Sequence, residues 1–98
     1  MRLPLAFHRA ARVEFDQAAD WYDEQRTGLG AAFTAAVQNL LDQIRERPLL
    51  YPVALDDIRE AHIAGFPYCV YYNVNLDRVL VLAVFHTSRD PSIWQSRF

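Results

Sequence analysis

A histidine, two arginines and two tyrosines in the second half of the chain are the side chains best suited to chemistry. They are Arg59, Tyr68, Tyr72, His86 and Arg89. Cleavage of RNA without a metal ion needs a base for the 2′-hydroxyl, positive charge for the phosphate and an acid for the leaving oxygen. Arg59 is suited to clamping a phosphate. One candidate catalytic set is therefore Arg59, His86, Arg89 and Tyr72 (or Tyr68), for a metal-independent endoribonuclease.

The same residues also have structural explanations. His86 is expected at the end of a strand, where a backbone group or a carboxylate can hold its ring. Arg59 and Arg89 can form ion pairs with an acidic neighbour, Glu60 or Asp90. Both explanations stay open at this point.

No other catalytic chemistry is indicated. The three histidines and the single cysteine do not have metal-ligand spacing. The serines near the C-terminus have no nucleophile-elbow context, and no glycine-rich loop could cradle a phosphate. We therefore expect neither a metal nor a cofactor.

Composition predicts one globular domain, residues 1–98. Hydrophobic residues make up 52% of the chain and aromatic residues 13%, which suits a small packed core. The net charge is −2 and all ten basic residues are arginines, so the basic excess typical of nucleic-acid-binding proteins is absent. A single cysteine, no secretion signal and only short apolar runs predict a cytoplasmic protein without a membrane segment.

The elements that must position these residues centre on a predicted hairpin. Val79–Phe85 is an unbroken apolar run, which is typical of a strand covered on both faces and lying inside a sheet. Tyr68–Val74 is rich in tyrosine and valine and is the expected partner strand. Asn75–Arg78 supplies the polar turn between them.

Two helices precede the hairpin. Apolar residues recur with helical spacing over Arg9–Gln25 and again from Leu29 to about Arg47, with the break at Gly28 and Gly30. The outer face of the first helix is acidic and is either simply solvated or a docking surface for a basic partner. Its acidic residues are Glu14, Asp16, Asp20, Asp23 and Glu24.

The remaining segments complete a small sheet. Arg2–Phe7 is expected to be an edge strand because Pro4 removes a backbone donor. Leu49–Asp57 is predicted to be a loop and Ile58–Ile63 a strand. The fold class is thus α+β, in the order β-α-α-β-β-β, with a helical hairpin on one face of a mainly antiparallel sheet. The other face is expected to stay partly open, and a site is expected there.

With these elements in place, the chain resembles the RelE/ParE family of bacterial type II toxins, which cognate antitoxins hold inactive. The likeness spans nearly the whole chain and rests on spacing across many positions. The residues that carry it are Glu14-Phe15, Ala18, Trp21-Tyr22, Gly28-Leu29-Gly30, Phe33, Pro48, Arg59, Phe66-Pro67-Tyr68, Val70, Tyr72, His86, Arg89-Asp90-Pro91, Trp94 and Arg97.

The resemblance implies one of two activities. Some members cut mRNA in the ribosomal A site, and the ParE-like members poison DNA gyrase. This chain has no lysine, no carboxylate in Pro48–Leu55 to act as a base, and no basic excess. We therefore expect a ParE-like gyrase inhibitor rather than an enzyme. The alternatives are a ribosome-dependent endoribonuclease and a non-toxic antitoxin-binding module.

The resemblance also implies contact surfaces. The segment Thr87–Phe98 and the open sheet face are expected to meet the target or the antitoxin, as parts of a hetero-oligomer. Arg59, Arg89 and Arg97 are expected anchors for an acidic antitoxin. The full expected contact set is Arg59, Tyr68, Tyr72, His86, Arg89, Trp94 and Arg97.

Overall fold

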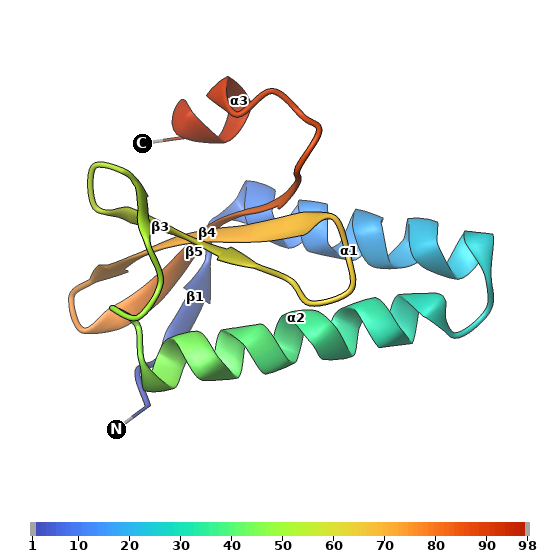
Figure 1. Ribbon diagram of the computed structural model, residues 1–98, viewed down its shortest axis with the longest axis horizontal. Coiled ribbons are helices and arrows are strands. Elements are labelled where there is room, and N and C mark those ends of the chain that lie inside the picture. Colours follow the sequence, from blue (N-terminus) through green and yellow to red (C-terminus); the bar gives the residue numbers. More distant parts are fainter. Residues whose placement is uncertain (1, 98) are drawn as a thin grey trace.

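Five strands form one open sheet in the order β1-β5-β4-β3-β2 in the computed structural model, which describes residues 2–97 (Figure 1). The elements in chain order are β1 (Leu5–Phe7), α1 (Arg9–Gln25), α2 (Leu29–Glu46), β2 (Val53–Leu55), β3 (Ile58–His62), β4 (Tyr68–Asn75), β5 (Arg78–His86) and α3 (Ser92–Gln95). The predicted α+β class and the helical hairpin over one sheet face are confirmed. No helix within residues 2–97 is long and apolar enough to span a membrane.

The strand β5 lies inside the sheet, as its apolar run predicted. It pairs in parallel with β1, where Leu5 lies opposite Val79, and antiparallel with β4, where Tyr68 lies opposite His86. The short strand β1 is the sheet edge, which accommodates Pro4. Because β1 ends beside Val81, the C-terminal half of β5 has no strand on that side.

The helices α1 and α2 cover one face of the sheet. Their apolar faces pack on residues from β3, β4 and β5 to form the main core. Gly28 joins the helices with a left-handed φ of 91°, and Gly30 permits their close approach, since a Cβ there would lie 2.5 Å from the carbonyl oxygen of Ala19. Asp23 accepts a hydrogen bond from the Gly28 backbone at 2.9 Å, so it supports this turn.

The C-terminal segment covers part of the opposite sheet face. The C-terminal segment crosses this side of the sheet, away from α2 (Figure 1). Its Trp94 is 2% exposed and stacks on Tyr71 with a centroid distance of 4.1 Å. Trp94 belongs to a second apolar cluster on this face, separate from the main core, which consists of Ile58, Leu82, Ala83, Phe85 and Trp94. The face expected to be partly open is thus covered in part by the chain's own tail.

Two short elements were not predicted. The strand β2 lies within Leu49–Asp57, which was predicted to be a loop; it has only three residues and gains its hydrogen bonds from β3. The helix α3 has four residues, too few for a periodic pattern. The carboxylate of Asp90 accepts a hydrogen bond from the Ser92 backbone at 3.0 Å and thus caps its start.

Candidate functional site

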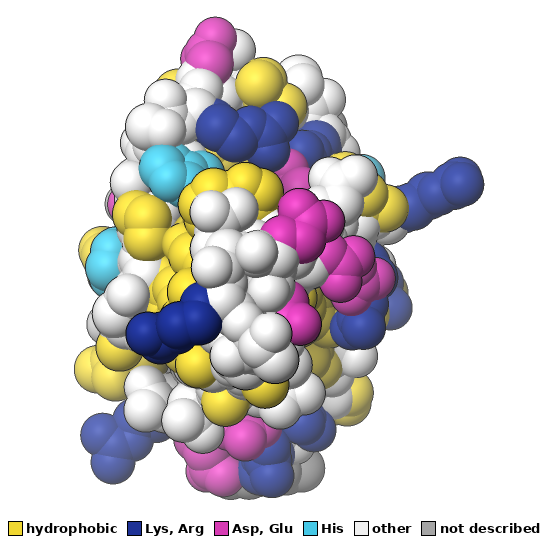
Figure 2. Space-filling model, turned by 90° about the vertical axis from the view of Figure 1, so that its right-hand side faces the viewer, with side chains coloured by type: hydrophobic (Ala, Val, Ile, Leu, Met, Phe, Trp, Pro, Cys, Tyr) yellow, Lys and Arg dark blue, Asp and Glu magenta, His cyan; other side chains and the backbone are white. Residues whose placement is uncertain are grey.

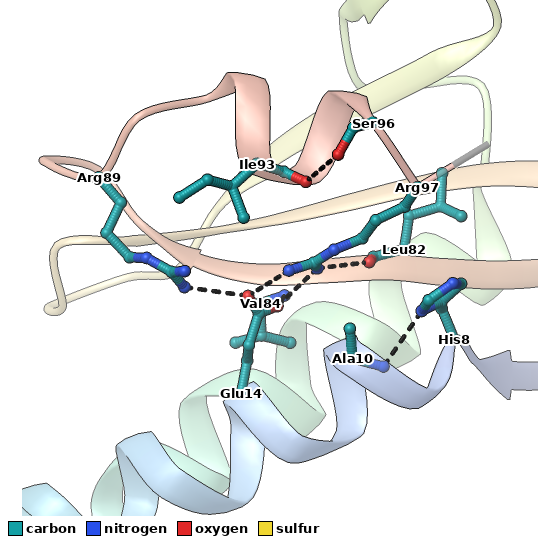
Figure 3. Close-up of polar contacts among 9 residues, drawn as sticks. All are labelled: His8, Ala10, Glu14, Leu82, Val84, Arg89, Ile93, Ser96 and Arg97. Atoms are coloured by element: carbon teal, nitrogen blue, oxygen red, sulfur yellow. Dashed lines mark hydrogen bonds and ion pairs between the residues drawn. The ribbon is translucent and has the colours of Figure 1, made fainter.

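One carboxylate joins α1, β5 and the C-terminal segment. Glu14 accepts two hydrogen bonds from Arg97, at 2.9 and 2.8 Å, and one from Arg89 at 3.0 Å (Figure 3). It also accepts the backbone N–H of Val84 at 3.2 Å. Arg97 in turn donates to the carbonyl oxygen of Leu82 at 3.0 Å. Glu14 and Arg97 thus bind the backbone groups of β5 that a neighbouring strand would otherwise pair on this side.

Glu14 was assigned to the acidic outer face of the first helix, expected to be either solvated or a docking surface, and this assignment is wrong for Glu14. Its side chain is only 10% exposed, whereas the other four acidic residues of that face are exposed. The sequence carried no local sign of its burial. The only available indication was the presence of arginines at the far end of the chain.

Three connected hollows run along α1 beside this ion pair, and we call them together the α1 groove. Their volumes are about 440, 220 and 350 Å³. The first and the middle hollow share Glu14, Gln17 and Arg89, and the middle and the last share Trp21, Tyr68 and His86. The groove therefore extends from the start of α1 to the turn that precedes β4.

Two large apolar side chains on α1 lie exposed in this groove. Val13 is 47% and Trp21 53% exposed. Together with Gln17 they are spaced four residues apart, so they share one face of the helix. This face is separate from the stripe of α1 that packs into the core. Exposed apolar surface bordered by polar groups is typical of a protein-binding site.

His86 lies at the end of β5, and a backbone group holds its ring. The Ser88 backbone N–H donates to Nδ1 at 3.0 Å, and the Ser88 hydroxyl lies 2.8 Å from the same atom. The neutral ring therefore carries its proton on Nε2. The ring also packs edge-on against Tyr68, with a centroid distance of 5.0 Å.

Tyr68 contributes a hydroxyl to the middle and last hollows. Burial raises the pKa of Tyr68, and the neighbouring Tyr22 raises it further, while Arg89 acts in the opposite direction. The hydroxyl therefore keeps its proton at neutral pH and can donate a hydrogen bond. In the described part of the chain, no residue hydrogen bonds to this hydroxyl.

Arg89 is the most accessible charged group at the centre of the groove. Its side chain is 43% exposed and lies over the ring of Phe85 at 4.2 Å. Its ion-pair partner is Glu14 rather than the sequence neighbour Asp90. The pKa of Asp90 is lowered by the backbone N–H of Ser92, consistent with a capping role.

The structure does not bring Arg59 and Tyr72 to this groove. Arg59 donates to the carbonyl oxygen of Tyr51 at 2.6 Å, and the Tyr72 hydroxyl donates to that of Pro48. Tyr72 is fully buried, and burial raises its pKa to about 12. In the sheet register, Arg59 of β3 lies opposite Tyr72 of β4, whereas His86 of β5 lies opposite Tyr68 of β4. Tyr68 and Tyr72 are four residues apart, so Arg59 and His86 are separated by about 13 Å along the strand direction. Of the candidate catalytic residues, His86, Arg89 and the alternative Tyr68 therefore share the middle hollow, whereas Arg59 and Tyr72 lie elsewhere.

The C-terminal segment contributes few exposed side chains from the expected contact set. Trp94 is buried, and the Arg97 side chain is 12% exposed within its ion pair. The accessible members of this segment include Arg89 and Ile93, which is 43% exposed. Phe98, the last residue of the expected contact segment, lies outside the described residues.

Metal-ligating side chains do not cluster in the part of the chain that the structure describes. Within residues 2–97, no group of three or more histidine, cysteine, aspartate and glutamate residues could hold a metal ion. The expectation of a protein without metal or cofactor stays a prediction.

Comparison with known proteins gives the family. The model of the ParE toxin family, described as the toxin of the type II toxin-antitoxin system parDE, matches residues 5–91. A solved structure described as the chromosomal ParDE TA system from P. aeruginosa superposes with a TM-score of 0.66 at 16% identity, covering 89% of this chain and 98% of that chain. At that identity the likeness concerns the fold. No curated protein matches the sequence. Because the family model covers most of the chain, the chain belongs to the ParE toxin family of type II toxin-antitoxin systems.

Proposed function

We propose that this toxin inhibits DNA gyrase through protein contacts and that a cognate antitoxin neutralises it in a cytoplasmic hetero-oligomer. The α1 groove is the observation that carries the proposal. It is a continuous surface with exposed Val13 and Trp21 along one helix and accessible Arg89 beside them. Such a combination suits a polypeptide partner, because apolar contacts supply affinity and a charged residue supplies orientation.

A protein target is favoured over RNA for two reasons. Arg59 and His86 lie about 13 Å apart along the sheet, so neither can assist the other at one phosphate. The net charge of −2 also provides no general attraction for a polyanion. An endoribonuclease site at His86, Arg89 and Tyr68 would have to act without Arg59.

The proposal is tested with the purified toxin and purified gyrase. We expect the toxin to trap gyrase on supercoiled plasmid as double-strand breaks after protein denaturation, and to arrest growth when expressed alone in bacteria. Coexpression of the antitoxin encoded with the toxin should remove both effects. Ribosome-dependent cuts in transcripts, without gyrase-linked breaks, would instead identify an endoribonuclease, and normal growth would identify a non-toxic binding module.

The role of the α1 groove is tested by a matched pair of variants. Trp21→Ala removes an exposed side chain from the groove, whereas Leu50→Ala removes one that is 65% exposed beside the end of α2, outside it. We expect Trp21→Ala to weaken either gyrase trapping or antitoxin binding at least tenfold. Leu50→Ala should leave both unchanged. Equal behaviour of the two variants would place the partner surface elsewhere.

A further inference from the structure

We infer that the middle hollow of the α1 groove binds a single carboxylate side chain of an acidic polypeptide partner. The hollow has a volume of about 220 Å³ and includes Arg89, His86 and Tyr68 in its lining. The inference deepens the proposed function and rests on its claim that the groove meets a polypeptide. It adds the chemistry of the group that is recognised.

The charge balance of the ion-pair cluster favours an incoming anion. Two guanidinium groups share the one carboxylate of Glu14. Arg97 donates three hydrogen bonds within the cluster, because both of its terminal nitrogens donate to Glu14 and one also donates to Leu82, and its side chain is only 12% exposed. Arg89 uses only Nη1, and within residues 2–97 its other N–H groups have no partner. The cluster therefore keeps one positive charge and several donors for a ligand.

Two residues with neutral donors, His86 and Tyr68, also line this hollow. The hydrogen bond from Ser88 to Nδ1 leaves the Nε2–H of His86 as the remaining donor of that ring. The ring of Tyr68 packs edge-on against the ring of His86, and its hydroxyl is a further donor. Three donors thus come from β4, β5 and the following segment, and a carboxylate has two oxygens to accept them.

The surroundings favour a carboxylate on a protein over the phosphates of a nucleic acid. Acidic side chains gather at the end of the molecule where α1 joins α2, beside exposed hydrophobic side chains and arginines (Figure 2). The exposed acidic residues of α1 are Asp16, Asp20, Asp23 and Glu24. None of these four residues lines the three hollows, so they repel an extended chain of phosphates only at the rim of the groove. The stronger reason is that apolar groups beside one carboxylate would cover the exposed Val13 and Trp21, which a chain of phosphates would leave in water.

The spacing of the groove specifies the shape of the partner segment. Val13 and Trp21 are eight residues apart on α1, or about 12 Å. Gln17 and the middle hollow lie between them. A helix that lies along α1 would therefore present an acidic residue between two apolar residues, at positions i, i+4 and i+8.

The test uses two synthetic helical peptides that differ only at one position, where one has a carboxylate and the other an amide. Each carries leucine at i and i+8; the first has glutamate at i+4 and the second glutamine. Titrated into the isotope-labelled full-length toxin, the glutamate peptide should bind about tenfold more tightly than the glutamine peptide. It should shift the ring signals of His86 and the indole N–H of Trp21.

Variants of the toxin assign the effect to this hollow. Arg89→Gln should abolish the difference between the peptides, and Tyr68→Phe, which keeps the ring, should reduce it. Arg2→Gln is the matched control, because Arg2 is an exposed arginine that pairs with Asp42 on α2, away from the groove. It should leave the difference intact. Circular dichroism and the indole signal of buried Trp94 show whether each variant is folded.

Three results would overturn the inference: equal binding of the two peptides, no binding of either, or displacement of the glutamate peptide by hexauridylate at the same residues. None of these measurements involves gyrase or growth. Failure of the gyrase assay with the peptide difference intact would reject the proposed target alone, and the reverse outcome would reject the carboxylate site alone.

Discussion

Glu14 and Arg97, which are 83 positions apart in the chain, form a bidentate ion pair. Their side chains are 10% and 12% exposed. The pair fixes the C-terminal segment against α1, and it satisfies the backbone of β5 at Val84 and Leu82, where no strand continues the sheet. Long-range order of the tail therefore depends on one carboxylate in the second turn of the first helix.

Replacement of Glu14 by glutamine should lower the free energy of unfolding by about 3 kcal/mol, because it leaves a nearly buried guanidinium without a counter-charge. Urea unfolding followed by circular dichroism measures the change. Asp16→Asn is the control: Asp16 pairs with Arg12 on the same helix, both side chains are 57% exposed, and the expected loss is about 0.5 kcal/mol or less. Similar losses in the two variants would show that the tail does not depend on Glu14.

Trp94 was expected to contact a partner, but its burial makes it a determinant of stability. Trp94→Ala should lower the free energy of unfolding by about 3–5 kcal/mol, since it empties the space between the tail and Tyr71. The matched control is Trp21→Ala, at 53% exposure, for which we expect about 1 kcal/mol or less. Thermal melting of both variants measures the contrast.

This contrast also decides how growth assays are interpreted. Loss of growth arrest in a Trp94 variant would follow from loss of the folded tail. Loss of arrest in a Trp21 variant that melts normally would follow from a lost contact. A Trp94→Ala protein with unchanged melting and lost toxicity would contradict the structural role and restore the contact role.

Much of the fold follows from local patterns in the sequence. The apolar run of β5 and the helical periods of α1 and α2 are each long enough to determine an element by themselves. The strand β2 and the helix α3 are not, because each has three or four residues and depends on tertiary contacts.

The candidate site was harder to predict because it depends on register and distant pairing. The sequence places Arg59 and His86 on strands of one sheet, but only the pairing of β3 with β4 and of β4 with β5 shows that they lie at different levels. Likewise, Glu14 has the local surroundings of a solvated residue, and its burial is determined by Arg97 at the other end of the chain.

The turn between β4 and β5 should tolerate a stabilising change. Leu76 and Asp77 occupy its two central positions with φ of 53° and 58°, a left-handed conformation that side chains other than asparagine and glycine adopt at a cost. The double substitution Leu76→Asn and Asp77→Gly should therefore raise the free energy of unfolding by about 1 kcal/mol. Leu76→Val, which is β-branched, should lower it. Urea unfolding measures both, and a loss in the double variant would contradict this conformation.

Alkaline pH should destabilise the fold, beginning at the single cysteine. Cys69 is 5% exposed, and burial together with the neighbouring Glu60 raises the pKa of its thiol from 9.0 to about 11. Above pH 9 the unfolded chain loses this proton before the folded chain does, so the free energy of unfolding falls as the pH rises toward 11, by at most about 1.4 kcal/mol per pH unit for this group. The buried tyrosines, whose pKa values are also raised, add to the loss above pH 10.

The contribution of the thiol is measured as the slope of the free energy of unfolding against pH. The free energy at a single pH is not sufficient, because Cys69→Ala also removes buried volume and so changes stability at every pH. Between pH 9 and 10 the free energy of unfolding should fall less steeply in Cys69→Ala than in the unmodified toxin, when both are measured by urea unfolding at constant ionic strength. Asp16→Asn serves again as the control, since Asp16 is an exposed residue of α1 and does not belong to the sheet that holds Cys69. Parallel slopes in all three proteins would mean that the thiol titrates alike in the folded and unfolded chains, and the burial of Cys69 between β3 and β5 would then have no effect on its protonation.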